Sequence, residues 1–242
     1  LGDVYKRQVT NKMQTERHVL STPFRIGFLV YPHVTQLDFT GPAQFLAQMS
    51  DTELHFVWKE LAPIPTDAGF SVLPTATFES CPPLDMVCVP GGGGQRAIMS
   101  DTQVHAWLAS VGTEAKYITS VCSGSLLLAV AGLLTGYRAG AHWAFRDQLS
   151  LLGAVPVAER VVKDRNRITG GGVTAGVDFA LAVIEEVRGA EEAKAIQLML
   201  EYDPKPRYDC GSPDRASPET IGSAKRLLAK LEADAIRAGQ EA

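Results

Sequence analysis

The sequence predicts an α/β fold, a three-layer sandwich in which helices cover both faces of a mostly parallel sheet. Apolar, β-branched segments alternate with helical ones from Phe24 onward, which is the order of parallel α/β proteins. The segment MVCVP, residues 86–90, is apolar throughout, as expected of a strand buried on both faces. The chain has 242 residues and a hydrophobic fraction of 45%, which suffices for one α/β domain with a substantial core.

The first half of the domain is predicted to alternate strands and helices. Segments rich in β-branched and aromatic residues predict strands at residues 24–31, 53–60, 86–90 and 115–121, and a hairpin or edge excursion at 69–78. Amphipathic or apolar segments predict helices at residues 40–49, 101–112 and 125–134. Asp101 is a suitable N-cap for the second of these helices, and Gly136 ends the third.

The second half is predicted to be more helical. A helix is expected at 142–153, and a strand pair in 155–171 is expected to turn at Asp164–Arg167. Further helices are expected at 176–189, at 190–202 and, after a loop rich in Pro, Gly and Asp, from Pro218 onward. We therefore expect a domain at 23–212 and a helix within 213–242 that packs on this domain or on a dimer partner. Residues 1–22 are expected to lie outside the fold, as an extension that is either disordered or was added to the protein for expression.

Charge and hydropathy exclude several classes of partner. The net charge is −4 and the chain has no basic run, so the electrostatic pattern of a nucleic-acid-binding protein is missing. The longest apolar run, residues 126–134, is much shorter than the roughly 20 residues of a membrane-spanning helix. The N-terminal residues contain no apolar core of a secretory signal, so a cytoplasmic location and a small-molecule partner are the default expectations.

The four cysteines are expected to be free thiols. Cys81, Cys88, Cys122 and Cys210 form no CxxC pair and are not accompanied by histidines at the spacing of a zinc site. In a cytoplasmic chain this scatter also argues against a disulfide framework. No structural zinc site is therefore predicted.

Cys122 lies in a local pattern typical of a nucleophile elbow. The segment SVCSG, residues 120–124, places it between a predicted strand and a predicted helix, with small residues two positions away on either side. A sharp turn of this kind would expose the sulfur in a cleft, and the helix N-terminus would favour the thiolate and lower the thiol pKa. The alternative is a small core cysteine that happens to fall at a turn.

Asp38 and a run of glycines follow two other predicted strands. Asp38 stands between Leu37 and Phe39, before a helix expected to begin near Gly41. It is either a helix cap or a carboxyl group that faces a cleft, where apolar neighbours would raise its pKa and let it exchange protons near neutral pH.

The run Gly91–Gly94 directly follows the strand at 86–90 and offers backbone N–H groups for an anion or oxyanion site. Gly92 and Gly93 are the predicted donors, and a plain flexible turn is the alternative. Because no Gly-Lys-Ser/Thr follows, the run is not a phosphate-binding P-loop.

Two further residues are candidates for the same site. Ser123 follows the cysteine directly and could orient substrate or water through its hydroxyl group. His142, in the segment AGAHWAF, is the candidate partner for a Cys–His pair. Its spacing does not bring it to the thiol, so a histidine that caps or packs remains an equal alternative.

These motifs together resemble the PfpI-like branch of the class I glutamine amidotransferase-like superfamily. The resemblance rests on Asp38 after the first strand, the PGGGG loop, SVCSGSLLLAVAGLL, AHW and GGVTAGVD, and it extends over residues 24–212. The closing segment IQLMLEYDPKPRYDCGSPD is similar to the C-terminal signature of the branch. Within the branch, the chain is most similar to the members that hydrate isonitriles.

The resemblance implies a flavodoxin-like fold, a homodimer, no cofactor, and a hydro-lyase that converts an isonitrile to an N-substituted formamide. It implies that Cys122 is the nucleophile and that Asp38 donates a proton and activates water. The Gly92 and Gly93 amides and the Ser123 hydroxyl would orient substrate and water. Isonitrile-hydrating members usually have threonine after the cysteine, and Ser123 keeps its hydroxyl group without the methyl.

Two other functions compete with this hypothesis. The same fold forms the N-terminal half of AraC-type regulators, so the chain could be a non-catalytic sensing module, although it shows no helix-turn-helix segment. A redox sensor with an oxidisable Cys122 is also consistent with the elbow but does not explain Asp38. Peptidase and deglycase functions are disfavoured, because related branches with those activities have glutamate in place of Asp38 or histidine after the cysteine.

Overall fold

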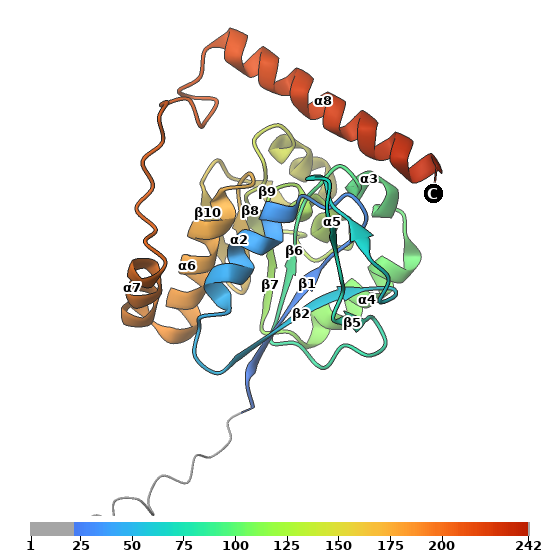
Figure 1. The fold of residues 1–242 in the computed structure, drawn as a ribbon, viewed down its shortest axis with the longest axis vertical. Helices are drawn as coiled ribbons and strands as arrows, with labels where there is room; N and C mark the ends of the chain where they lie inside the picture. Colours follow the sequence, from blue (N-terminus) through green and yellow to red (C-terminus); the bar gives the residue numbers. More distant parts are fainter. Residues whose placement is uncertain (1–21, 242) are drawn as a thin grey trace, which may run out of the picture.

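A seven-stranded sheet forms the centre of the protein (Figure 1). The computed structural model describes residues 22–241, so the extension expected at 1–22 lies almost wholly outside the described residues. The strand order is β10-β11-β7-β6-β1-β2-β5, and every neighbouring pair is parallel except β10 and β11. The sheet is therefore mostly parallel, as the sequence predicts.

The strands of this sheet are short and their central members are buried. Their bounds are β1 Phe24–Leu29, β2 Thr52–Trp58, β5 Ala76–Thr77, β6 Met86–Val89, β7 Tyr117–Ser120, β10 Val161–Asp164 and β11 Arg167–Gly170. Two small sheets stand apart and pair β3 Ile64–Pro65 with β4 Ser71–Val72, and β8 Arg138–Ala139 with β9 Val155–Pro156. All four residues of β6 are buried, as expected for a strand covered on both faces.

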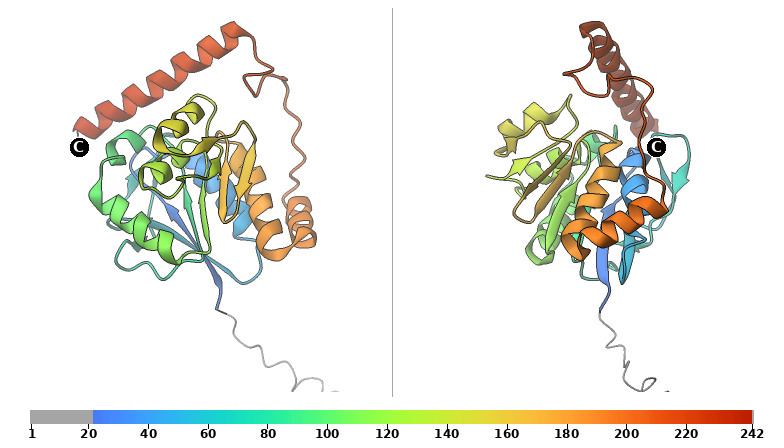
Figure 2. Two further views of the ribbon diagram at one scale, coloured as in Figure 1. Left: turned by 180° about the vertical axis from the view of Figure 1, so that it is seen from behind. Right: turned by 90° about the vertical axis from the view of Figure 1, so that its left-hand side faces the viewer.

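Helices cover both faces of the sheet, which makes three layers (Figure 2). Helices α2 and α6 pack on one face, and α4 and α5 on the other. The helix bounds are α2 Gln36–Leu46, α3 Gln95–Ile98, α4 Thr102–Glu114, α5 Gly124–Val130, the 3₁₀ helix η1 Arg146–Leu152, α6 Ala175–Arg188, α7 Ala190–Met199 and α8 Pro218–Glu241.

Several predicted elements differ from the structure in extent. The helix expected near Gly41 already begins at Gln36, with Pro42 inside it. The helix expected at 125–134 ends at Val130, because the chain turns through Gly132 at φ +77°. The segment 142–153 forms the 3₁₀ helix η1 instead of an α-helix.

The segment 69–78 forms no hairpin of its own. Its first strand, β4, pairs with β3, while β5 joins the edge of the main sheet beside β2. The hairpin of β10 and β11 turns at Asp164–Arg167 as predicted. Asp101 caps α4 by accepting hydrogen bonds from the backbone of Gln103 and Val104, at 3.0 and 3.2 Å.

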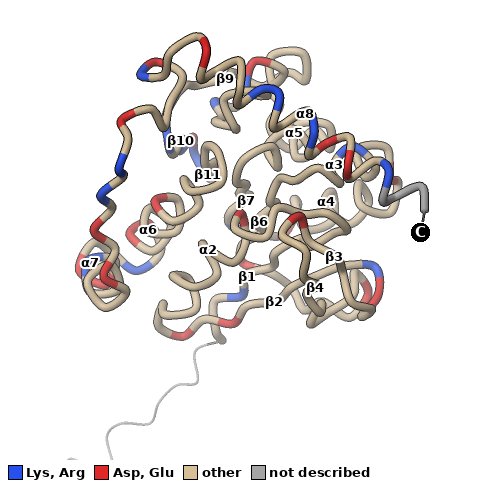
Figure 3. The backbone as a smooth tube through the Cα atoms, turned by 45° about the horizontal axis from the view of Figure 1, so that its top comes forward, with Lys and Arg blue, Asp and Glu red and all other residues tan. Residues whose placement is uncertain are grey.

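Helix α8 stands apart from the three layers. It follows a long loop and crosses above the carboxyl ends of the strands, so that its C-terminal half lies near α3 (Figure 1). Figure 3 shows basic and acidic residues along its length. Leu227 and Leu231 on this helix are 66% and 52% exposed, while Ala235 is buried.

Candidate active site

Cys122 occupies a sharp turn between β7 and α5. Its φ of +62° lies in the left-handed region, which is strained for a residue other than glycine. Its backbone N–H donates to the carbonyl of Gly171 at 2.8 Å and lies 3.2 Å from that of Gly170, which fixes the turn against the end of β11. The residue is buried, at 6% exposure. The turn expected from the sequence is therefore present, but Cys122 is buried and the turn does not expose its sulfur as predicted.

The small neighbours of Cys122 are required by close packing. A Cβ at Gly124 would lie 1.9 Å from the carbonyl oxygen of Val89, so only glycine fits there. Ser120 and Ser125 are fully buried, and their hydroxyl groups form a hydrogen bond of 2.8 Å. These contacts hold the turn against β6 and leave no room for larger side chains.

Asp38 comes to the same place from helix α2. It is the third residue of that helix and is fully buried. Its Oδ2 accepts a hydrogen bond of 2.8 Å from the backbone N–H of Gly91, whereas Oδ1 has no nitrogen or oxygen partner among the described residues. Because the N-cap of α2 is Thr35, Asp38 is not the helix cap that the sequence left open.

Asp38 and Cys122 form one coupled pair. Burial raises the pKa of Asp38 to about 7, and hydrogen bonds from the Gly91 backbone and from the Cys122 thiol lower it in part. Burial and the negative charge of Asp38 raise the pKa of Cys122 well above its usual range. The low thiol pKa that the sequence predicts is therefore wrong for the free protein, because burial and a neighbouring carboxylate outweigh the helix N-terminus.

Two backbone N–H groups favour the thiolate despite this burial. Hydrogen bonds from the backbone of Val173 and Ser123 lower the pKa of Cys122. Val173 precedes α6 in the glycine-rich segment GGGVTAG, residues 170–176, which overlaps the GGVTAGVD motif of the family resemblance. A run of small residues before a helix is the signal that could have assigned it to the site.

The glycine loop at 91–94 packs directly against Asp38 and Ser123, a contact that its sequence does not predict. A Cβ at Gly91 would lie 2.4 Å from Ser123 Oγ and 3.0 Å from Asp38 Oδ2. The backbone N–H of Gly92 lies 3.4 Å from Ser123 Oγ, and Gly92 has φ +144°. Gly93 instead faces α8, since its Cβ would lie 2.8 Å from that of Ala235. Of the two predicted donors, Gly92 contacts Ser123 at the candidate site, while Gly93 packs against α8.

Two buried polar side chains near the pair were not singled out from the sequence. Gln95 donates through Nε2 to the backbone carbonyl of Ser123 at 2.7 Å and so holds the elbow from α3. Tyr31 donates to the carbonyl of Pro90 at 3.0 Å. Burial and the negative charges of nearby groups, Asp38 first among them, raise the pKa of Tyr31 well above its usual range. Tyr31 and Gln95 both follow the end of a strand, but a single polar residue forms no sequence motif from which its place in the site could be predicted.

His142 contacts Cys122 through the backbone. Its N–H donates to the Cys122 carbonyl at 3.2 Å, and its Nδ1 accepts from the Ala144 backbone at 3.3 Å. The ring packs against Gly172, where a Cβ would meet it at 2.4 Å, and burial lowers its pKa. The structure records no interaction between this ring and the thiol. His142 therefore supports the elbow, and the Cys–His pair considered from the sequence is replaced by Cys122 with Asp38.

All four cysteines are free, as predicted. Burial raises the pKa of Cys88 to about 12 and that of Cys81 to about 11, so these thiols are less ionised than ordinary cysteines. Cys210 is exposed on the loop between α7 and α8. Only Cys122 combines a strained turn, a buried carboxyl neighbour and backbone N–H donors.

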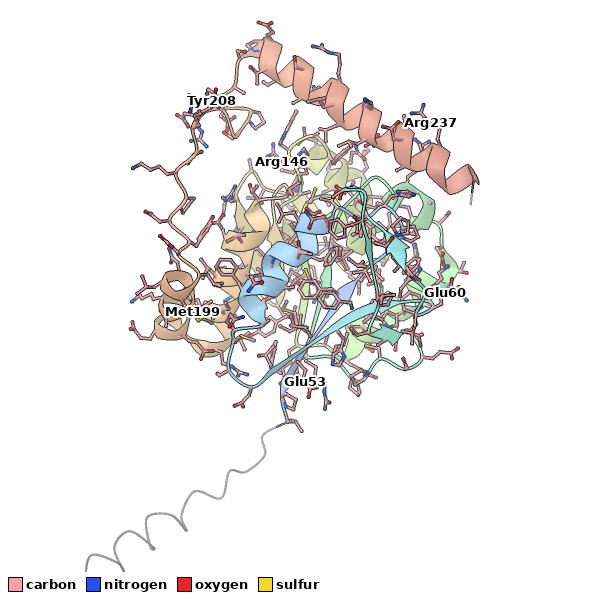
Figure 4. All side chains as sticks on the ribbon, viewed as in Figure 1. Glu53, Glu60, Arg146, Met199, Tyr208 and Arg237 are labelled. Atoms are coloured by element: carbon pink, nitrogen blue, oxygen red, sulfur yellow. The ribbon has the colours of Figure 1, made fainter. Side chains whose placement is uncertain are left out.

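The candidate site lies at the carboxyl edge of the sheet. Arg146, in η1 just after His142, is at the opposite end of the molecule from Glu53, which marks the amino end of β2 (Figure 4). Ligands of parallel α/β proteins bind at this carboxyl edge. Within residues 22–241, no group of three or more His, Cys, Asp or Glu side chains could hold a metal ion. Nor does a helix in that range have the length and apolarity to cross a membrane.

Comparison with known proteins agrees with this architecture. Residues 24–186 match the model of the DJ-1/PfpI family. The chain belongs to this family. A crystal structure of a THiJ/PfpI family protein from Pseudomonas syringae superposes with a TM-score of 0.84 at 44% identity, covering 91% of this chain and 92% of that one. The flavodoxin-like fold expected from the resemblance is thereby confirmed.

Similar proteins within the family include an enzyme and a transcriptional regulator. The chain is 50% identical over 205 residues to isonitrile hydratase from Pseudomonas putida, covering 85% of this chain and 90% of that protein. It is 32% identical over 192 residues to the HTH-type transcriptional regulator GbdR from Pseudomonas aeruginosa, which covers 75% of this chain but only 51% of the regulator. It is 26% identical over 186 residues to protein DJ-1alpha from Drosophila melanogaster, covering 74% of this chain and 84% of that protein.

Proposed function

We propose that this protein hydrates isonitriles to N-substituted formamides, with Cys122 as the nucleophile and Asp38 as the proton relay. One observation carries the proposal: a buried carboxyl group and a buried thiol share one site at a strained elbow. The 50% identity to an isonitrile hydratase over most of both chains supports the same reaction. No cofactor is needed for the steps below.

The first step adds the thiol across the terminal carbon of the isonitrile. This carbon carries a lone pair and becomes electrophilic as it accepts a proton, so attack by sulfur needs an acid beside it. Asp38 takes the thiol proton and passes a proton to this carbon while the Cys122 sulfur attacks it. The product is a thioimidate, R–N=CH–S, on Cys122, with Asp38 ionised.

The second step hydrolyses this thioimidate. Ionised Asp38 removes a proton from water as the oxygen adds to the carbon, and it passes this proton to the nitrogen. The tetrahedral adduct then collapses: the C–S bond breaks, the hydroxyl proton returns through Asp38 to the sulfur, and R–NH–CHO leaves. Asp38 and Cys122 together hold one proton before and after the cycle.

Neighbouring polar groups orient the reactants. Ser123 Oγ lies within reach of the Gly92 N–H, and its own hydroxyl proton can be donated to water or substrate. The backbone N–H groups of Val173 and Ser123 stabilise charge on the sulfur when the C–S bond breaks. Gly93 packs against α8 and His142 contacts Cys122 by its backbone, so neither is assigned a step in this proposal.

The proposal is tested with a panel of alkyl and aryl isonitriles. The purified protein is expected to produce the matching formamides, detected by mass spectrometry, and Cys122→Ala is expected to produce none. Cys210→Ala serves as the matched control, since this thiol is exposed and distant in sequence from the elbow. No formamide from any isonitrile with the folded wild-type protein would overturn the proposal.

A ligand-sensing module is the second candidate function. It is favoured by the 32% identity to the regulator GbdR, of which this chain spans about half the length. In that case the site would bind a small molecule without turning it over. Calorimetry that shows stoichiometric binding of isonitriles or formamides without product would support sensing over catalysis.

We further propose that the protein is a homodimer in which α8 contributes to the interface. Leu227 and Leu231 leave an apolar stripe uncovered on this helix. Charged residues of both signs flank this stripe along α8. Two antiparallel copies related by a two-fold axis would cover both apolar stripes.

A further inference from the structure

Asp67 connects a distant loop to the start of helix α2. It lies between β3 and β4, and its Oδ1 accepts a hydrogen bond of 3.0 Å from the backbone N–H of Gln36. Its own backbone N–H donates to the carbonyl of Val34 at 3.1 Å. Gln36 is the first residue of α2, and Asp38 is the third.

The carboxylate of Asp67 supplies a cap that α2 lacks locally. The N-cap residue Thr35 makes no side-chain capping hydrogen bond. The first N–H groups of a helix need acceptors, and a negative charge is favourable at this end. Asp67 provides both from outside the helix.

The residues just before α2, which Asp67 contacts, also form hydrogen bonds to the glycine loop at 91–94. Val34 forms bridges to Thr66 on one side and to Gly92 on the other. The backbone N–H of Thr35 donates to the carbonyl of Gly91 at 3.0 Å, and Gly91 donates to Asp38. A displacement of this segment would therefore move the carboxyl group and the loop that contacts it together.

Asp67 also acts on the candidate site by charge. Its negative charge raises the pKa of Asp38, in addition to the larger effect of burial. The other titratable groups that interact with Asp38 are Cys122 at the elbow, Tyr31 after β1 and Cys88 on β6. Asp67 is the exposed member of this set, so it can be changed without opening the core.

We propose that Asp67 is a positioning residue for the reaction, which caps α2 at Gln36 and, as a carboxylate, controls the proton shared by Asp38 and Cys122. This inference rests on the proposed function, because the shared proton is the one that the isonitrile carbon receives. It assigns a role in the reaction to the loop between β3 and β4, which supplies neither the nucleophile nor the relay.

The test compares Asp67→Asn with Asp67→Ala through the pH dependence of kcat/KM for an alkyl isonitrile. The active form requires ionised Asp38, so wild-type kcat/KM is expected to rise with pH around a midpoint near 7. Asn keeps an oxygen acceptor for Gln36 but removes the charge. Asp67→Asn should therefore move the midpoint of this rise, the acid limb of the profile, to lower pH by on the order of half a unit. Its kcat/KM at pH 6 should then exceed that of the wild type.

Further variants separate charge from capping. Asp67→Ala removes both, so it should show the same shift and a lower kcat at every pH. Glu79→Gln removes an exposed carboxylate in the turn after β5 and should leave the profile unchanged. High salt should shift the wild-type limb towards that of Asp67→Asn and leave the variant in place, because an exposed charge is screened.

A readout without substrate distinguishes failure of this inference from failure of the proposed function. Carbon-13 NMR of labelled aspartate follows the Asp38 carboxyl directly, with Asp38→Asn to assign the signal. Its titration midpoint should be lower in Asp67→Asn than in wild type, whether or not isonitriles are hydrated. An unchanged midpoint, or a uniform loss of activity in Asp67→Asn with no shift of the limb, would overturn the role of Asp67.

Discussion

Asp38 is a carboxyl group buried at a cost to stability. Its pKa in the folded protein is about 7, above the value of an exposed aspartate, because burial disfavours the charged form. Between roughly pH 4 and pH 7 the folded state binds this proton and the unfolded state does not, so stability falls as pH rises through this window. A buried carboxyl group whose pKa lies near neutral pH is suited to proton transfer.

Asp38→Asn should therefore be more stable than wild type at pH 8. The variant keeps an oxygen acceptor for Gly91 and removes the buried charge, which corresponds to on the order of 2–4 kcal/mol in the free energy of unfolding. The difference should shrink as pH falls and vanish near pH 4. Urea unfolding at pH 4, 6 and 8 measures it, and a constant difference across this range would contradict the raised pKa.

Gly91 is predicted to be intolerant of any side chain. A methyl group there would meet Ser123 Oγ and Asp38 Oδ2, so Gly91→Ala should displace the carboxyl group from the thiol. We expect kcat to fall at least tenfold while the far-ultraviolet circular dichroism stays unchanged. Gly211→Ala is the control, since no atom lies within 4 Å of the added carbon there and its φ is not in the left-handed region. Equal activity of both variants would contradict the close approach.

At the residue scale, the sequence predicted which side chains meet at the candidate site better than their pKa values. Cys122 was recognisable because an elbow needs small residues at fixed positions in the sequence. Its pKa depends on Asp38, which lies 84 positions earlier in the chain, and no local pattern reports that contact. Gln95 and Val173 were missed for the same reason, since their contacts with the elbow are made only by the fold.

At the element scale, helix α2 shows how tertiary contacts override local signals. The sequence predicts a helix start near Gly41, because proline is favoured in the first turn. In the structure α2 begins at Gln36, where Asp67 caps it, and Pro42 packs on Gly176 of α6. The longer helix is what carries Asp38 into the site.

Helix α4 offers a test of an element that the sequence predicts correctly. Its cap, Asp101, accepts two backbone hydrogen bonds and pairs with Lys59. Asp101→Ala should lower the free energy of unfolding by about 1 kcal/mol, the usual worth of an N-cap. Isonitrile turnover should be unaffected, since α4 lies outside the candidate site. Thermal unfolding together with an activity assay checks both, and loss of activity in the folded variant would contradict this separation.

At the scale of the whole molecule, the alternation of strands and helices was sufficient to predict the layered fold. The shortest strands were less predictable. The edge strand β5, and β8 and β9 of a separate small sheet, have only two residues each and depend on neighbours for their hydrogen bonds. The placement of α8 above the carboxyl edge also depends on contacts such as that of Ala235 with Gly93. An amphipathic pattern predicts such a helix but not its neighbours.

The exposed stripe of α8 leads to a prediction about assembly. Light scattering at micromolar concentration should give twice the chain mass of 26.0 kDa. The double variant Leu227→Glu with Leu231→Glu should shift the protein towards monomer, because it places charge on the apolar stripe. Leu198→Glu on α7, at a residue that is 82% exposed, is the matched control. A wild-type monomer would contradict the predicted dimer.

The central claim is that Asp38 and Cys122 act as one unit on an isonitrile, and the turnover of Asp38→Asn tests it most directly. The substitution keeps the shape of the side chain and removes the proton relay. Formamide production per active site should fall by roughly 10²–10⁴, the usual worth of a positioned acid–base group, in a variant that is folded and at least as stable as wild type. Near-normal turnover of Asp38→Asn, with Cys122→Ala inactive, would show that another group moves the proton and would contradict the account.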